Sequence, residues 1–126
     1  MTETPIDGRQ VATAQSMGAT FSTPSVSLKK VKQLSIQCAY TGTPTGVWTI
    51  EVSLNRKEGV NGAFTDSDGT WIALASTQFT GTLPVPAGAG STFIIIVPIS
   101  PFRRIRVTYT RTSGTGSADI WINGQG

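Results

Sequence analysis

The chain has 126 residues, of which 13% are charged, and its formal net charge is +3. This length predicts one domain with a real hydrophobic core, and the charged fraction is about half of the usual share. With 38% hydrophobic residues the composition excludes intrinsic disorder. The basic residues are too sparse for a nucleic-acid-binding surface. They form two small groups, one at Lys29, Lys30 and Lys32 and the other at Arg103, Arg104 and Arg106.

The residue types that carry most protein chemistry are scarce. The sequence has no histidine, which removes the commonest general base and metal ligand. Cys38 is the only cysteine, so no intrachain disulfide forms, and we expect it to be a small buried hydrophobe. The segment 66–69 begins like a calcium loop but lacks the closing Glu. We therefore expect a non-enzymatic protein with no catalytic residues, metal or cofactor.

Residues 1–18 are polar, lack periodicity, and are punctuated by Pro5, Gly8 and Gly18. They predict an extended N-terminal arm that orders on a neighbouring subunit, or else a loose terminus. The rest, residues 19–126, forms the predicted domain. The chain has no apolar run long enough to span a membrane, and we expect no secretory signal, because no basic region followed by an apolar segment is visible. We expect synthesis in a reducing cytoplasm and no membrane partner.

Short segments with an apolar residue at every second position follow one another between Gly- and Pro-rich turns, and none looks helical. About seven or eight such strands predict an all-β fold, an antiparallel, jelly-roll-like β-sandwich. The segment 93–97 is apolar without alternation, which indicates that both of its faces are covered. Strands are expected at 33–40, 47–55, 71–75 and 92–99, with a weak first strand at 20–28, a further candidate at 78–83 and a last pair inside 101–126.

The last pair reads as a β-hairpin closed by the Gly-rich turn 112–116. Its first strand places Arg104 and Arg106 on one face, opposite Ile105, and we expect both guanidinium groups to leave the sandwich together. Asp119 on the second strand is the expected partner ahead of Glu51. An exposed ion pair stabilises little, so we expect both arginines to attach the protein to a partner, with attachment weakened by salt.

Trp121 alternates with Ile120 and Ile122. Either Trp121 is exposed, to stack on a sugar ring or pack on another subunit, or the two isoleucines face a partner and Trp121 is core. Together with the apolar segment 93–97, this predicts a homo-oligomer, with a trimer ahead of a dimer.

The sequence also carries a family resemblance. The turn Thr-Gly-Thr-Pro-Thr-Gly at 41–46, the strand 48–55, the pair Thr70-Trp71 and the segment Arg-Ile-Arg-Val-Thr-Tyr-Thr-Arg-Thr-Ser-Gly-Thr-Gly at 104–116 resemble small virion-associated β proteins of tailed bacteriophages. The chain departs from that pattern at 52–56 and in the long connection to Thr70. The resemblance implies a structural component of the phage particle and no catalytic residues.

We therefore expect a capsid decoration or cement protein, made in the host cytoplasm, that binds and stabilises the major capsid lattice in the virion. An alternative is a sugar- or receptor-binding module of a phage tail or fibre, with Trp121 or Trp71 as its stacking platform. An accessory domain of a virion hydrolase ranks third. The candidate partner-interface residues are Arg104, Arg106, Trp121, Lys29, Lys30 and Lys32.

Overall fold

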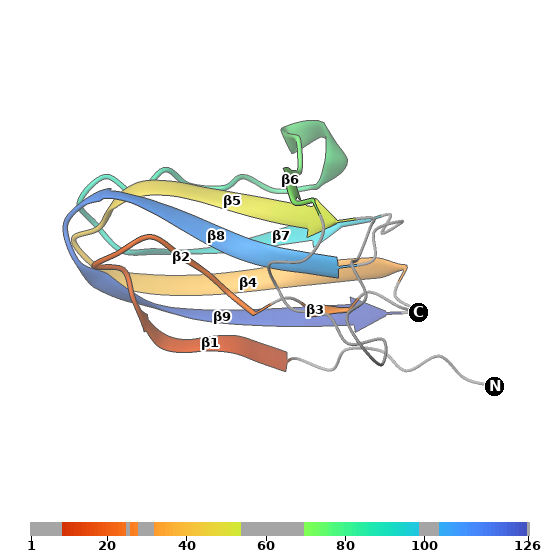
Figure 1. Ribbon diagram of the computed structural model, residues 1–126, viewed down its shortest axis with the longest axis horizontal. Helices are drawn as coiled ribbons and strands as arrows, with labels where there is room; N and C mark the ends of the chain where they lie inside the picture. The colour runs from red at the N-terminus through yellow and green to blue at the C-terminus, as the bar shows by residue number, and fades with distance from the viewer. Residues whose placement is uncertain (1–8, 25, 28–31, 54–69, 99–103, 126) are drawn as a thin grey trace.

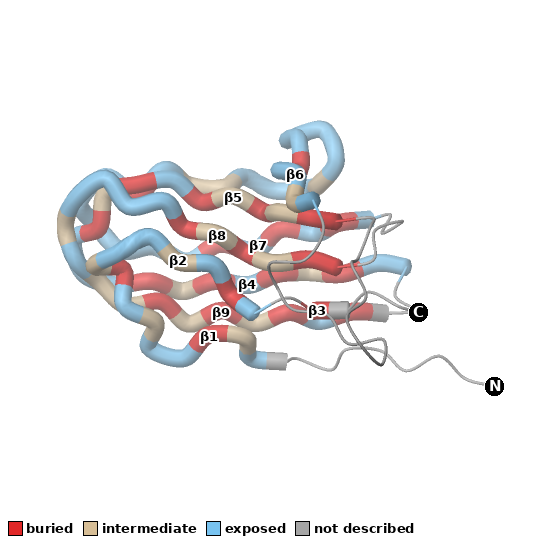
Figure 2. Tube along the Cα trace, viewed as in Figure 1, coloured by how far each residue is buried: buried red, intermediate tan, exposed pale blue. Residues whose placement is uncertain are grey.

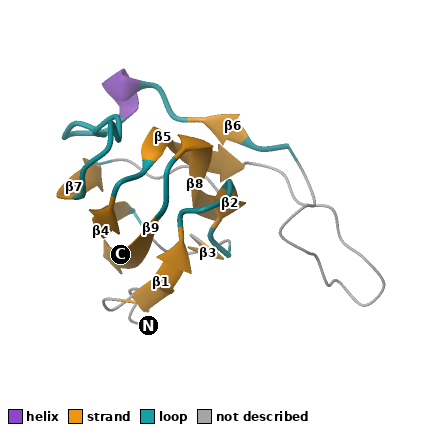
Figure 3. Ribbon diagram, turned by 90° about the vertical axis from the view of Figure 1, so that its left-hand side faces the viewer, coloured by secondary structure: helices purple, strands orange, loops and turns teal. Residues whose placement is uncertain are grey.

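The computed structural model describes residues 9–24, 26–27, 32–53, 70–98 and 104–125, which form two antiparallel sheets facing each other (Figure 1). Sheet A has the order β1-β9-β4-β7, and sheet B the order β2-β8-β5-β6 with β3 also on β8. Seen along the strands, the two sheets form the two layers of a sandwich (Figure 3). The strands of sheet A are β1 (Arg9–Ser16), β4 (Gln33–Gly42), β7 (Ser91–Val97) and β9 (Gly116–Gln125), and those of sheet B are β2 (Phe21–Ser22), β3 (Val26–Ser27), β5 (Thr45–Ser53), β6 (Ile72–Ala73) and β8 (Arg104–Ser113).

This strand order is that of a jelly roll, which confirms the fold expected from the sequence. The short strands β2 and β3 occupy one edge position on β8, which leaves eight strand positions. Every connection between consecutive positions changes sheet, except the one from β5 to β6. The crossings β1–β2, β4–β5, β6–β7 and β8–β9 lie together at one end (left in Figure 1).

The expected C-terminal hairpin is wrong, because β8 and β9 belong to different sheets. β8 pairs with β5 in sheet B, while β9 pairs with β4 and β1 in sheet A. Both strands carry an apolar row, and in the sandwich these rows face each other across the core. The crossing at 114–115 packs against the crossing at 43–44, where the Thr43 amide donates to the Thr115 carbonyl at 2.8 Å. Gly114 has φ +77°, and a Cβ there would lie 2.0 Å from the Thr43 oxygen, so this corner requires glycine.

The expected arm over residues 1–18 is wrong from residue 9 onward, because β1 is an edge strand of sheet A. It pairs with β9 from Arg9 opposite Ile122 to Ser16 opposite Ser117. Two register shifts interrupt the pairing, and these irregularities conceal the period-two pattern of a strand in the sequence. Ala12 and Met17 belong to the core, so the domain boundary does not fall at residue 18. Residues 1–8 lie outside the described part of the chain.

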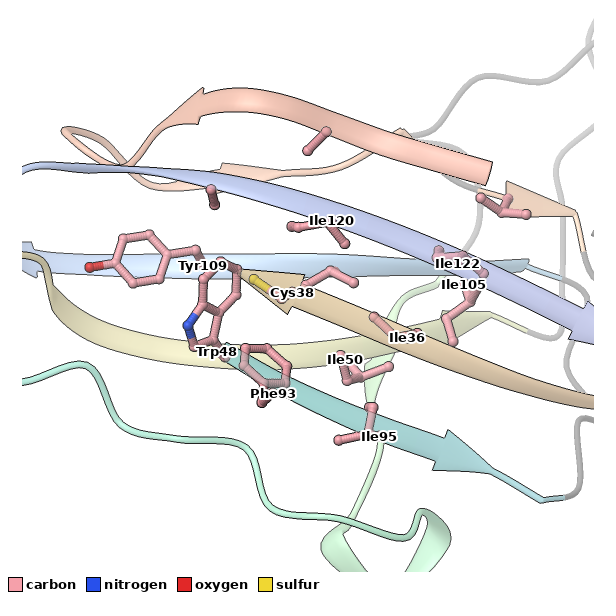
Figure 4. Close-up of a cluster of buried hydrophobic side chains, with 14 of the residues drawn as sticks. Ile36, Cys38, Trp48, Ile50, Phe93, Ile95, Ile105, Tyr109, Ile120 and Ile122 are labelled. Carbon is pink, nitrogen blue, oxygen red and sulfur yellow. The ribbon is translucent and has the colours of Figure 1, made fainter. Parts of the chain in front are cut away.

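The core lies between the sheets, where every second residue of the long strands is buried (Figure 2). At the crossing end, Trp48 is surrounded by four aromatic rings, with centroid distances of 5.0 to 6.0 Å for the ring pairs of this cluster. Isoleucines and Cys38 continue the core toward the other end (Figure 4). The rings around Trp48 are those of Phe21, Tyr40, Phe93 and Tyr109.

The apolar segment 93–97 alternates in burial even though its residue types do not. Phe93, Ile95 and Val97 point into the core, whereas the exposed fractions of Ile94 and Ile96 are 54% and 38%. We expected both faces of this strand to be covered, but the described part of the chain covers only the inner face. Two large aliphatic side chains lie on the outer face of sheet A.

Candidate binding surfaces

The outer face of sheet B carries the two arginines predicted to bind a partner. Arg106 lies directly opposite Glu51 on β5, and its Nε donates to Glu51 Oε1 at 2.9 Å. The Thr108 hydroxyl donates to the same carboxylate oxygen. The Arg106 charge is therefore paired within the chain. The expected partner Asp119 lies in the other sheet, where its Oδ1 accepts a hydrogen bond from the Ala14 amide at 2.7 Å.

Trp71 brings the two arginines together, because both guanidinium groups lie over its ring. The distances to the ring centroid are 4.9 Å for Arg104 and 4.3 Å for Arg106, which is cation–π geometry. The two side chains share one side of the sheet as expected, but only 1% of Arg104 is exposed. Burial excludes Arg104 from a contact surface, so its predicted exposure is wrong.

The structure describes only one of the three lysines in the predicted basic group at 29–32. Lys29 and Lys30 lie outside the described residues, and Lys32 is exposed just before β4. Among the described candidates, Arg104 and Arg106 lie on β8 of sheet B and Trp121 lies on β9 of sheet A, so these three do not share one surface.

A second surface borders β5, and no sequence pattern predicted it. Val47 on β5, Ile72 on β6 and Val85 in the connection to β7 have exposed fractions of 48%, 63% and 71%. Ile72 pairs with Val52 of β5, and the Pro86 carbonyl accepts a hydrogen bond from the Gly46 amide at 3.1 Å. These three aliphatic side chains thus lie on β5 or on segments bonded to it. We call them the β5 surface.

Trp121 lies on the outer face of sheet A. It is half-buried, while the neighbouring Ile120 and Ile122 are completely buried, so Trp121 points outward and the isoleucines are core. In the register of the sheet, Gln37 lies between Trp121 of β9 and Ile94 of β7.

The next row, two residues along the strands, has the same construction. Here Ser35 lies between Asn123 and Ile96. The outer face of sheet A therefore shows two parallel rows across β9, β4 and β7, each with an isoleucine on β7 and polar neutral groups beside it.

These two rows line two adjoining hollows, which we call the sheet A groove. The larger has a volume of about 320 Å³ and the smaller about 180 Å³, and both are bordered by Ser35 and Asn123. The larger is lined also by Gln37, Ile94 and Trp121, and the smaller by Gln33, Leu34 and Ile96. The sequence could not show this groove, because the register of three strands distant in the chain brings its residues together.

Reactive groups are sparse in the part of the chain that the structure describes. No cluster of three or more potential metal ligands occurs among these residues. Burial, with a smaller contribution from the Asp119 charge, raises the pKa of the Cys38 thiol to about 12. Cys38 is completely buried, as expected from its alternating position. None of the described segments is a helix with the length and hydrophobicity of a membrane span.

No protein-family model matches the chain, and no curated protein matches it either.

Proposed function

We propose that the protein is a non-enzymatic structural component of a bacteriophage particle, a capsid decoration or cement protein that binds the major capsid lattice. The resemblance of the segments at 41–46 and 104–116 to small virion-associated β proteins supports this proposal. The jelly roll is compatible with it, since viral capsid domains use this fold, as do lectins. A fold alone does not decide a function, so the proposal depends on a surface.

The β5 surface is the observation that carries the proposal. Val47, Ile72 and Val85 are each about half exposed or more, and they lie along one strand of sheet B, with Val47 and Val85 near its start and Ile72 opposite Val52 near its end. Apolar side chains exposed along one strand offer contact area to a partner. Beside them the Glu51–Arg106 pair neutralises its own charge. A surface of this kind fits short-range packing on a lattice.

Attachment through the β5 surface changes one expectation from the sequence. Arg104 is buried and Arg106 is already paired, so neither supplies a free charge to an acidic capsid strip. We therefore propose that attachment to the lattice depends weakly on salt, because apolar burial is not screened.

The experiment is quantitative mass spectrometry of purified particles of the phage that encodes the chain. A decoration protein is present in hundreds of copies per virion, whereas a dozen copies or fewer indicate a tail location. Absence of the chain from the particle contradicts the proposal.

A second measurement tests the surface. Empty capsids are mixed with the variant Ile72→Lys plus Val85→Lys and sedimented, and we expect binding to be lost. The control Thr92→Lys adds a charge at an exposed position of β7 in the other sheet. Binding of the double variant at wild-type strength excludes the β5 surface from the contact.

A further inference from the structure

The sheet A groove lies on the opposite layer from the β5 surface, and its lining is free of charged groups. Among the described outward residues of β4, β7 and β9, Asp119 is the only charged one, and its carboxylate already accepts a hydrogen bond from the Ala14 amide. The hollows themselves are lined by hydroxyl, amide, aliphatic and indole groups. Because no charged side chain among the described residues lines the hollows, the lining favours a neutral ligand.

The dimensions of the groove fit a small polar ring. Three neighbouring strands span about 10 Å, and two rows of outward residues are about 7 Å apart along the strands. The larger hollow, at about 320 Å³, is at the lower end of the range for small-molecule sites. One or two sugar rings match this area.

The groups in the groove complement the two kinds of surface on a pyranose. Trp121 and Ile94 offer apolar area to the C–H face of the ring. Gln37 carries an amide with donors and an acceptor, and Ser35 adds a hydroxyl, for the alternating hydroxyl groups at the ring edge.

Two other occupants fit the groove less well. Nucleobases also stack on indole rings, but single-stranded nucleic acids require a positively charged track for the phosphates, and in the described part of the chain no charged side chain lines the hollows. Trp71, the other platform considered for a sugar, already has the guanidinium groups of Arg104 and Arg106 over its ring.

We propose that the sheet A groove binds a neutral glycan, with Trp121 as the stacking platform and Gln37 and Ser35 as the hydrogen-bonding groups. This proposal does not depend on capsid attachment, because it uses the other sheet.

The test is isothermal titration of the full chain with methyl glycosides of glucose, galactose, mannose and N-acetylglucosamine, followed by their neutral oligosaccharides. We expect one of these neutral series to bind, and we expect Trp121→Ala to weaken its binding by about tenfold or more. The variant Gln37→Ala, which keeps the platform, is expected to weaken it by about fivefold. The matched control Thr112→Ala truncates an exposed side chain of β8 in sheet B, outside both proposed binding surfaces, and leaves the affinity unchanged.

Thermal melting of each variant is recorded first, so that a folding defect is separated from a binding defect. If Trp121→Ala lowers the Tm, the binding measurement uses two other variants instead. These are Trp121→Phe, which retains a ring, and Gln37→Ala. The proposal is wrong if no neutral glycan binds at millimolar concentration, if binding is unchanged in both Gln37→Ala and the Trp121 variant, or if only acidic probes such as sialyllactose bind. It is also wrong if light scattering shows an oligomer that Trp121→Ala dissociates, since a second copy then fills the groove.

Discussion

Arg104 and Arg106 are two residues apart on β8 and share the ring of Trp71, but they differ in burial. Arg104 is 1% exposed, whereas the Arg106 side chain is 19% exposed and paired with Glu51. We expect Arg104→Ala to lower the free energy of unfolding by about 2 kcal/mol or more, through a desolvated cation–π contact and lost packing. Arg106→Ala is expected to lower it by about 1 kcal/mol, because a partly exposed pair contributes little. Urea denaturation measures both, and equal losses contradict this assignment.

The Cys38 thiol is expected to be inert in the folded protein. Its pKa is raised from the usual 9.0 to about 12 by burial, so almost no thiolate is present at pH 8, and the thiolate is the reactive form. A chromogenic disulfide reagent should label Cys38 in guanidinium and not in buffer. Rapid labelling of the native protein contradicts the buried position.

The same shift makes stability depend on pH. The folded protein binds the thiol proton more tightly than the unfolded chain does, so the full stability is present below pH 9.0. It is lost progressively as the pH rises from 9.0 toward about 12. Urea denaturation at pH 8 and at pH 10 is expected to show the lower midpoint at pH 10, and Cys38→Ala should reduce this difference.

At the scale of the elements, β1 is the strand that the sequence conceals. We expect Met17→Ala to lower the free energy of unfolding by about 2 to 5 kcal/mol, because Met17 is completely buried at the end of this strand. Thr13→Ala at an exposed position of β1 is the control, with an expected change within about 0.5 kcal/mol. Deleting residues 1–18 should therefore unfold the domain or lower its Tm sharply. An unchanged Tm favours the extended arm.

The elements differ in how well a sequence predicts them, for physical reasons. The strands at Gln33–Gly42 and Thr45–Ser53 were recognisable because each buries every second residue. The strands with which they pair were not recognisable, because a Thr-Gly turn has the same composition whether it closes a hairpin or crosses between sheets. The irregular pairing of β1 removed its periodicity. Arg104 lies over the ring of Trp71, which is 33 residues earlier in the sequence, so its burial could not be predicted from its own strand.

The candidate surfaces were predicted less well than the strands. The outward direction of Trp121 was one of two alternatives in the sequence, and the buried isoleucines on either side decide between them. The sheet A groove and the β5 surface both depend on the pairing of strands distant in the chain. The predicted partnership of Arg106 with Asp119 failed for the same reason, since it assumed that β8 and β9 are neighbours.

At the scale of the whole molecule, we propose that the chain forms a homo-oligomer, with a trimer ahead of a dimer. The β5 surface supplies exposed aliphatic area for contact between copies. Light scattering over a range of concentrations is expected to show an oligomer that Ile72→Lys dissociates. The proposal is contradicted if light scattering shows a monomer at every concentration and cross-linking on capsids also detects no contact between copies.

The order in which the strands pair has a consequence for how the chain acquires its structure. The central strands β8 and β9 come last, and β9 pairs with β1 and β4 while β8 pairs with β2, β3 and β5. A ribosome delivers the chain from its N-terminus, so neither sheet is complete until residues 104–125 have emerged. Folding dominated by such distant pairings takes milliseconds to seconds. We expect stopped-flow refolding without a dominant sub-millisecond phase, and a nascent chain that exposes its apolar strands to chaperones until synthesis is almost finished.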